Sequence, residues 1–536
     1  MDKGVLNTIR EKGLLLEKEI YDLISGFNNA RVARDFLEQL EKVSGQKLLT
    51  RSVLNKNVGY VKQFVNQLPG EDKSVVEKVF VNLGLSLEVR REKEVIEEIS
   101  LKNLEKHHYK IIYSDTAPDK KLEVRDFTKH FRARYQQLQR ILMQRPELQR
   151  NLVSINKISS DRTNVGIIAI VTEKRITKNK NLIITFEDLT GEIKALVKFD
   201  REEIFQKAEE LQLDDVVGIK ASGNRDILFV YDIFYPDSFI YEKMRFESDI
   251  NVAFISDTHC GSGRHLAKSF NRFLEWINGD SEVAKKIKYL FFVGDSVDGV
   301  GIFPGQEAEL NLKTMEEQYG LVASYLKRIP KHITIFMCPG QHDATRVAEP
   351  QPIINKKYAP QLYEIENLVL VTNPTMVKLL EGEKEFKVLM YHGASMNALI
   401  NEVKSLRMMK AYRCPAKAVE QMLKRRHLAP MYGVSPSIVY VPNAEHDPLV
   451  ISEVPDVLCT GEVHHLDVGS YNRVLIITGS CWQAQTPFEE KVGHVPDPCK
   501  VPVLNLKTRE LKVFDFRDDT EVDEIGTWRG NNGGRG

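Results

Sequence analysis

Five short apolar runs in the second half of the chain each end beside residues that can hold a metal ion or a phosphate. These runs are Asn251 to Ser256, Lys288 to Val293, Ile333 to Cys338, Lys387 to Met390 and Asp456 to Thr460. Runs of this length, bounded by turn residues, are typical of buried strands. In open α/β sheets the ligand site lies beyond the carboxyl ends of the strands, so the five ends predict one shared site.

Residues 151–240 show the alternation of a β barrel. The expected strands are Val165 to Val171, Asn181 to Asp188, Glu192 to Val197, Val216 to Ala221 and Leu228 to Ile233, with a helix from Arg201 to Leu211. This arrangement predicts a five-stranded OB-fold barrel, and any other small β barrel is the alternative. Its basic residues lack the interleaved aromatic residues that bind single strands, so we expect the barrel to act chiefly as a scaffold.

The other regions complete an α+β multidomain organisation. Residues 1–85 have helical spacing, for example at Phe36 and Leu40, which predicts a small helical N-terminal domain. Residues 86–150 comprise a charged linker and a helix from Asp126, whose basic residues we expect to meet solvent or protein rather than DNA. Residues 248–515 form the predicted α/β domain with the shared site, and the glycine-rich residues 516–536 predict a flexible tail.

Composition narrows the class of protein. The 536 residues, 42% of them hydrophobic, are enough for three or four domains, and 75 basic residues balance 75 acidic ones. Whole-chain charge therefore gives no sign of nucleic acid. The six cysteines form no Cys-x-x-Cys pair, which argues against a thiolate zinc site. Neither a signal peptide nor an apolar run of about 18 residues is evident, so we expect no membrane association and a cytoplasmic location.

The residues at the strand ends have the chemistry of a two-metal site. The candidate ligands are Asp257, His259, Asp295, Gln341, His392, Glu462 and His464. This mixture of imidazole, carboxylate and amide suits manganese, iron or zinc better than magnesium, and so many ligands predict two divalent metal ions, with manganese the first expectation. Two ions about 3.5–4 Å apart can activate a water and hold the attacking and leaving oxygens of a phosphodiester in line.

Each candidate ligand has an expected place. Asp295 is the expected bridging carboxylate, and Asp257 and His259 would serve one ion. Gln341, His392 and either Glu462 or His465 would serve the other, with His464 completing the set.

Two further residues are candidates for catalysis. We expect His342 to stay off the metals and to supply a proton or positive charge to the reacting phosphate, with the adjacent Asp343 orienting it. The remaining histidines His265, His332, His427, His446 and His494 lack such a context and are interpreted as surface or packing residues.

The order Asp-x-His, Gly-Asp, Gly-x-His-Asp, His and Gly-x-x-His resembles that of the calcineurin-like metallophosphoesterases. From about residue 120 to 515 the chain further resembles the small subunits of archaeal family D DNA polymerases. The stretches that carry this resemblance are 126–135, 426–430, 482–486 and 500–507. The resemblance implies a calcineurin-like fold for residues 248–515 and a proofreading 3′–5′ exonuclease acting on DNA with a 3′ end. It also implies a large catalytic polymerase subunit as heterodimer partner and a sliding clamp as a further partner.

Two positions depart from the phosphoesterase pattern. Gln341 stands where the group usually has Asn, and Glu462 stands where it usually has His. Both types can bind these metals, but Glu adds a negative charge. These departures leave an alternative, namely that the chain is a structural subunit whose active site has decayed. The architecture also resembles that of the eukaryotic polymerase B subunits, in which this is the case. A phosphatase with the same metal core is another alternative, against which the barrel argues.

Overall fold

The computed structural model describes residues 108–116, 121–433, 439–492 and 494–522, together with parts of 9–49. The chain divides into two units, residues 1–106 and 107–536. In the first unit the helix predicted from the spacing of Phe36 and Leu40 is α3 (Ala30–Ser44), and β1 (Leu15–Leu16) pairs in parallel with β2 (Leu48–Leu49). The rest of the predicted helical domain and most of the predicted linker lie outside the described residues.

The second unit contains two six-stranded sheets. The first has the order β12-β11-β10-β9-β18-β19, in which β9 to β12 are parallel. Its strands are β9 (Asn251–Ile255), β10 (Ile287–Val293), β11 (Thr334–Cys338), β12 (Leu368–Leu370), β18 (Lys500–Asn505) and β19 (Leu511–Asp515). The second has the order β16-β17-β15-β14-β13-β3. Its strands are β3 (Tyr109–Tyr113), β13 (Thr375–Glu381), β14 (Lys384–Met390), β15 (Val457–Thr460), β16 (Asp467–Tyr471) and β17 (Val474–Thr478).

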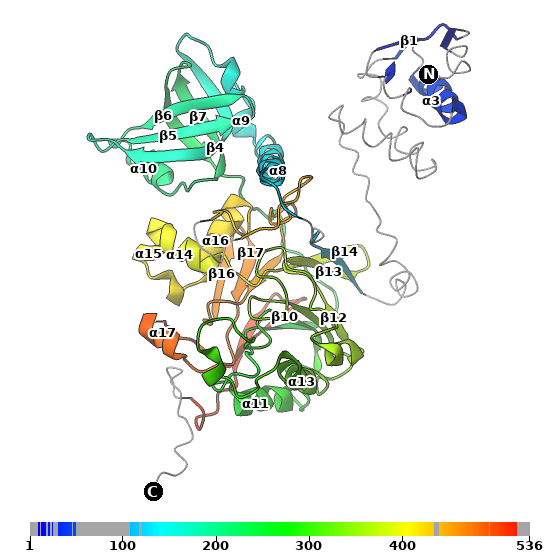
Figure 1. Cartoon of the computed structure of the whole chain (residues 1–536), viewed down its shortest axis with the longest axis vertical. Coiled ribbons are helices and arrows are strands. Elements are labelled where there is room, and N and C mark those ends of the chain that lie inside the picture. Colours follow the sequence, from blue (N-terminus) through cyan, green and yellow to red (C-terminus); the bar gives the residue numbers. More distant parts are fainter. Residues whose placement is uncertain are drawn as a thin grey trace. The chain divides into compact units, whose positions relative to one another are not determined.

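The two sheets pack face to face, with helices on both outer faces (Figure 1). Tyr289 and Phe291 of β10 belong to the core between the sheets, whereas Leu290 and Phe292 join the core under the helices. Alternate side chains of one strand thus enter two cores, which explains why β10 reads as a continuous apolar run. The mixed α/β arrangement predicted for this region is confirmed.

The helices of this region are short. Those on the first sheet are α11 (Ala267–Ile277), α12 (Glu282–Lys285) and α13 (Met315–Leu326), with the 3₁₀ turns η2 (Gln306–Ala308) and η3 (Pro360–Glu364) nearby in sequence. The segment between β14 and β15 contains α14 (Met396–Glu402), α15 (Lys404–Met408), η4 (Ala411–Arg413) and α16 (Ala416–Arg425), and α17 (Pro487–Val492) follows β17. Among the described helices, none has the length and apolar character needed to cross a membrane.

A closed five-stranded barrel in the order β4-β5-β6-β8-β7 precedes the two sheets. Its elements are η1 (Ile155–Lys157), β4 (Thr163–Ile176), β5 (Leu182–Asp188), β6 (Gly191–Val197), α10 (Glu202–Glu209), β7 (Val216–Gly223) and β8 (Leu228–Phe234). The predicted strands and the helix between the third and fourth are therefore found. Apolar side chains from all five strands fill the barrel, so it has a core of its own.

The helix α8 (Val124–Leu142), followed by α9 (Pro146–Gln149), connects the barrel to the sheets. On one side Tyr135, Leu138 and Leu142 pack with Ile168 and Val216 of the barrel. The C-terminal half of α8 thus packs on the barrel through apolar side chains, and the helix also carries a buried charge, Arg134.

Asp447 lies at the centre of a buried network that holds α8. Its Oδ2 accepts hydrogen bonds from Arg134 Nε at 2.7 Å and His427 Nε2 at 2.9 Å, and His130 Nε2 lies 3.3 Å away. His427 Nδ1 accepts from the Ala429 backbone N–H, and burial with the nearby Arg134 charge lowers the pKa of His427 to about 4. His427, interpreted from sequence as an ordinary residue, is thus a neutral member of a charged network.

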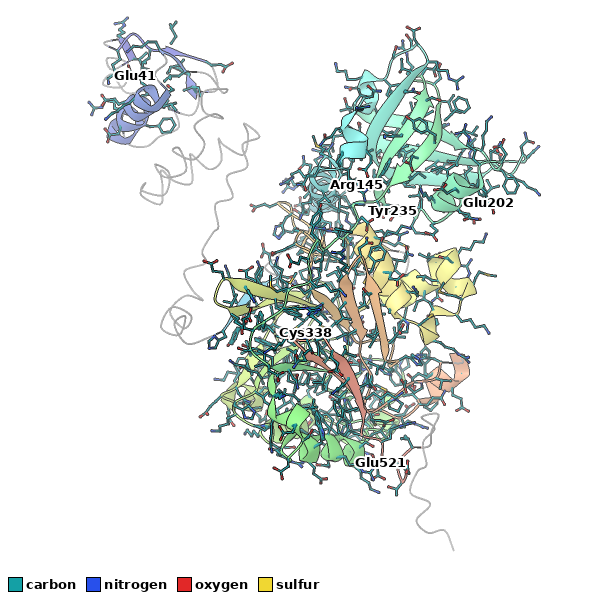
Figure 2. The ribbon with its side chains drawn as sticks, turned by 180° about the vertical axis from the view of Figure 1, so that it is seen from behind. Glu41, Arg145, Glu202, Tyr235, Cys338 and Glu521 are labelled. Atoms are coloured by element: carbon teal, nitrogen blue, oxygen red, sulfur yellow. The ribbon has the colours of Figure 1, made fainter. Side chains whose placement is uncertain are left out.

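A second buried pair joins the barrel to α16. Arg425 Nε donates to Asp215 Oδ1 at 2.8 Å, and both side chains are almost completely buried. Lys424 and Arg425 also lie over the ring of Tyr235, which is labelled at the base of the barrel in Figure 2. The barrel is therefore attached by buried ion pairs as well as by apolar contact.

The tail predicted from the sequence begins at residue 516, but the structure shows packed residues beyond that point. Phe516 and Val522 are buried in the core beneath α11, and the carboxylate of Glu521 accepts from the backbone N–H groups of Lys268 and Ser269 (Figure 2). Glu521 thereby satisfies free donors at the first turn of α11, which fixes the segment. Residues 516–522 are packed, and 523–536 lie outside the described residues.

We predict that Asp447→Asn destabilises the protein by about 3–5 kcal/mol, because it leaves the Arg134 guanidinium buried without its carboxylate. The measurement is the urea midpoint and the Tm. The control is Glu366→Gln, which breaks the exposed pair with Lys331 and should leave the urea midpoint and the Tm nearly unchanged. Equal effects of the two variants would contradict the prediction.

Candidate metal centre

Buried carboxylates and imidazoles converge at the ends of the predicted strands. Three groups have potential ligand atoms within 4.8 Å of one another: Asp257 with His259 and His464, Asp257 with Asp295 and His392, and His259 with Asp298 and His342. Asp257 belongs to two of the groups, and His259 links the third to the first. The groups therefore form one continuous centre.

The strand ends come from two sheets and not from one open sheet. Asp257 and Asp295 follow β9 and β10 of the first sheet, whereas His392 and Glu462 follow β14 and β15 of the second. Backbone hydrogen bonds tie neighbouring loops together, from Asp257 N to Gly294 O and from Gly461 N to His392 O. The centre lies where the carboxyl ends of both sheets meet, an arrangement that strand patterns alone do not reveal.

Five of the candidate ligands have left-handed backbone conformations. Their φ angles are 50° for Asp257, 43° for His259, 46° for Asp295, 69° for Glu462 and 54° for His464. Such conformations are uncommon for residues other than glycine and cost about 1–3 kcal/mol each. They turn each side chain sharply away from its strand, and their concentration at one site indicates function.

Glycines leave room for the ligand side chains. A Cβ added at Gly340 would collide with Asp295 Oδ1 and would come within 2.7 Å of His392 Nε2. At Gly461 it would come within 2.5 Å of Asp257 Oδ2. Each glycine thus permits close approach of the backbone to the carboxylates, and larger residues would displace them.

Each ligand imidazole has one nitrogen directed away from the centre and one directed into it. His392 Nδ1 lies 2.9 Å from Val293 O, His464 Nδ1 lies 3.0 Å from Glu489 Oε1, and His259 Nδ1 lies 3.2 Å from Asp298 Oδ1. Oxygen partners on Nδ1 favour the tautomer whose Nε2 lone pair is free for a metal. Consistently, the Nε2 atoms of His259 and His464 lie 3.0 Å apart.

Several donor atoms in the centre have no hydrogen-bond partner among the described residues. These atoms are Asp257 Oδ2, Gln341 Oε1 and His392 Nε2. Buried polar atoms normally find a partner, so unpartnered imidazole, carboxylate and amide donors in one place fit cation binding. The donor set agrees with divalent ions, and it does not identify the metal.

The charged groups of the centre shift the pKa values of one another. Burial alone would raise the pKa of Asp295, but His392 and His342 hold it well below its usual range. Burial would lower the pKa of His392 and His464, yet neighbouring carboxylates raise both well above the ordinary value. The carboxylates thus favour positive charge on the neighbouring imidazoles, and bound cations could take the place of these protons.

The structure distinguishes between Glu462 and His465. Glu462 Oε2 lies 3.4 Å from His392 Nε2, and its other oxygen accepts from Asn397 Nδ2 at 2.7 Å. Neither Glu462 nor His465 belongs to the three groups described above, but of the two, only Glu462 has an ion-pair contact with His392 among the described residues. Glu462 is therefore the residue positioned beside His392.

His342 lies at the edge of the centre and Asp343 lies away from it. His342 Nδ1 is 2.7 Å from Asp298 O, and its Nε2 is 4.0 Å from Asp295 Oδ2. The Asp343 carboxylate instead accepts from the Gly340 backbone and from the hydroxyls of Ser296 and Tyr319. Among the described residues the Asp343 carboxylate makes no hydrogen bond to His342, so the structure gives no support to the expectation that Asp343 orients it.

Sequence reasoning missed two residues that hold ligand imidazoles. Asp298 contacts His259 through its side chain and His342 through its carbonyl group, and it follows the Gly-Asp motif by three residues. Glu489 contacts both His464 and His494, and no sequence pattern near it signals this role. His494, interpreted as an ordinary residue, is therefore connected to the centre.

Residues 252–467, which include every candidate ligand, match the family of the B subunits of DNA polymerases alpha and epsilon. The chain is 33% identical over 517 residues to the DNA polymerase II small subunit of Pyrococcus horikoshii, covering 94% of this chain and 80% of that protein. It is 38% identical over 399 residues to the corresponding protein of Methanothermobacter thermautotrophicus, covering 73% and 80%. The chain belongs to the DNA polymerase II small-subunit family of archaea.

The chain spans less than two thirds of the length of one relative. The match to the Pyrococcus furiosus protein, at 39% identity, covers 72% of this chain and 63% of that relative. Among solved structures, one described as a novel archaeal phosphodiesterase aligns with 49% of this chain and 99% of its own, at 13% identity and a TM-score of 0.25. That similarity is too low to support a conclusion about fold or activity.

We predict that Gly340→Ala reduces bound manganese from about two ions per chain to one or none, because the added Cβ displaces Asp295 and His392. Metal analysis after dialysis measures this change. Gly320→Ala is the control, since its Cβ would meet nothing within 4 Å and alanine favours a helix. Full manganese content in a folded Gly340→Ala protein would disprove the proposed packing.

A second prediction separates the two candidate ligands after β15. Glu462→Ala should lose about one manganese ion per chain, whereas His465→Ala should keep both, because only Glu462 lies beside His392. Manganese counted per folded chain is the measurement. The reverse pattern would assign the position to His465.

Proposed function

We propose that this chain is a metal-dependent 3′–5′ DNA exonuclease that proofreads for the polymerase of its family. The observation that carries the proposal is the convergence of the imidazoles of His259, His392 and His464 with the carboxylates of Asp257 and Asp295 around unpartnered donor atoms. Glu462 joins them through its contact with His392. A structural subunit without catalysis has no need for this costly arrangement of buried charge.

The proposed ligand assignment follows the geometry. Asp257, His259, His464 and Asp295 would hold one cation, and Asp295, Gln341, His392 and Glu462 the other. Two bound divalent cations would supply Lewis-acid activation of the phosphodiester and of an attacking water. Asp295 would be shared, and the Gln341 amide oxygen is a free donor that replaces the Asn oxygen usual in this group.

His342 is the proposed proton donor. Its Nδ1 is held by the Asp298 carbonyl oxygen, which directs Nε2 toward Asp295. Burial opposes a charge on the ring, but Asp295 raises the pKa of His342 and favours the protonated form. A protonated ring at this position can stabilise charge on the phosphate and protonate the departing 3′ oxygen. Asp298, rather than Asp343, positions it.

The remaining assignments also follow from the family and the topology. We propose that the two-sheet region has the calcineurin-like metallophosphoesterase fold and that the barrel has the OB fold, since its order β4-β5-β6-β8-β7 is that of an OB barrel. The relatives are named small subunits, so a large polymerase subunit is the proposed heterodimer partner and DNA with a 3′ end the proposed substrate. A sliding clamp is a further proposed partner.

The test is release of nucleotides from a 5′-labelled primer with a mispaired 3′ end in the presence of manganese. We expect stepwise shortening from the 3′ end that a chelator abolishes. His342→Ala should slow the reaction by about 10²–10⁴-fold, the usual contribution of a general acid, with manganese content unchanged.

The control for this test is His332→Ala, a histidine outside the centre. A metal-replete protein that binds DNA and releases no nucleotide would favour the structural-subunit alternative, for which the departures at Gln341 and Glu462 are the specific support.

A further inference from the structure

Positive charge is concentrated in residues 396–417, between β14 and β15. This segment contains Lys404, Arg407, Lys410, Arg413 and Lys417 but only one acidic residue, in a chain whose total charges balance. Lys404 pairs with Glu209 and Lys417 with Glu420. The other three are exposed and have no ion-pair partner among the described residues, and we name Arg407, Lys410 and Arg413 the basic track.

Exposed apolar side chains accompany the basic track. Met408 is 74% exposed and Met409 is 47% exposed, and Phe488 on α17 is 71% exposed. Met408 and Met409 lie between Arg407 and Lys410 in the chain, and exposed apolar patches commonly mark interaction sites. Phosphates with attached bases match this combination, because cations bind the backbone while apolar and aromatic groups contact base faces.

Contacts connect this surface to the metal centre. From α14, Asn397 Nδ2 donates to the candidate ligand Glu462 at 2.7 Å. From η4, the ring of Tyr412 packs on His494 with centroids 5.6 Å apart, and His494 lies 3.3 Å from Glu489, which holds His464. In Figure 1 the helices α14, α15 and α17 lie along the same flank of the two-sheet region.

We propose that the basic track binds backbone phosphates of the single-stranded 3′ DNA end that enters the metal centre, with Met408 and Phe488 contacting its bases. The consequence for catalysis rests on the proposed exonuclease function, whereas the binding itself does not. Charge complementarity favours DNA as the occupant, because the track presents three positive charges without an ion-pair partner in the described part of the chain and has no acid within it, and a DNA backbone carries one negative charge per phosphate.

The test replaces Arg407, Lys410 and Arg413 together by glutamine. Binding of a fluorescent single-stranded oligonucleotide is measured across a salt series with chelator present, so that nothing is cleaved. Three lost phosphate contacts should reduce the slope of log K against log salt by about 2, and affinity should fall at least about tenfold. The matched control is Lys285→Gln with Lys327→Gln and Lys331→Gln, three exposed lysines on other elements, which should change neither.

Hydrolysis of bis(p-nitrophenyl) phosphate with manganese separates the two proposals. This small diester needs the metal centre but cannot reach the track, so the triple variant should hydrolyse it at the wild-type rate while degrading single-stranded DNA more slowly. If the wild-type protein hydrolyses neither substrate but the salt slope still falls in the variant, the exonuclease proposal fails and the track stands. A salt slope that is unchanged in the triple variant overturns the proposal that the basic track binds DNA. If the same variant also loses binding of the polymerase large subunit, the track is a protein-binding surface instead.

Discussion

The structure depends on keeping three carboxylates close together where water is largely excluded. Asp257 and Asp295 are buried, and Asp295 and Glu462 both lie within 3.4 Å of the same His392 nitrogen. Like charges at such distances repel strongly in a medium of low dielectric constant. The surrounding imidazoles offset part of this repulsion, which is why the pKa of His392 and His464 is raised despite burial. Divalent cations are the natural remaining counter-charges.

Such a centre requires a rigid frame, because each ligand would otherwise relax away from the others. The frame consists of strands buried on both faces, whose aromatic residues Tyr289, Phe291 and Phe336 stack between the sheets. Packing of this extent can hold Asp257, Asp295 and other ligands in left-handed conformations that are unfavourable by themselves. The stability of the sheets thus maintains the strain at their ends.

Sequence patterns predict the strands and the motifs that follow them, but they do not predict which strands pair or which distant side chains come into contact. The apolar runs predicted all five strands that precede the candidate ligands. Asp257, His259, Asp295, His392 and His464, which the motifs singled out, lie in the convergent groups, whereas Gln341 and Glu462 do not. An apolar run in the sequence does not show which other strands it pairs with, so the sequence does not predict that the candidate ligands come from two different sheets. The sequence does not reveal the roles of Asp298 and Glu489, because each contacts a ligand histidine that is distant from it in the chain. Asp343 was assigned to His342 from adjacency alone, and its side chain bonds Ser296 and Tyr319 instead.

The segment between His392 and Glu462 connects three parts of the molecule. Near its beginning Asn397 holds the candidate ligand Glu462, and its middle presents the basic track. At its far end Arg425 pairs with Asp215 of the barrel, and His427 joins the Asp447 network that holds α8. Because α14 to α16 pack in one apolar core, displacement of the buried ion pairs at one end would strain the other. The barrel therefore helps to fix the segment beside the candidate metal centre through these buried contacts.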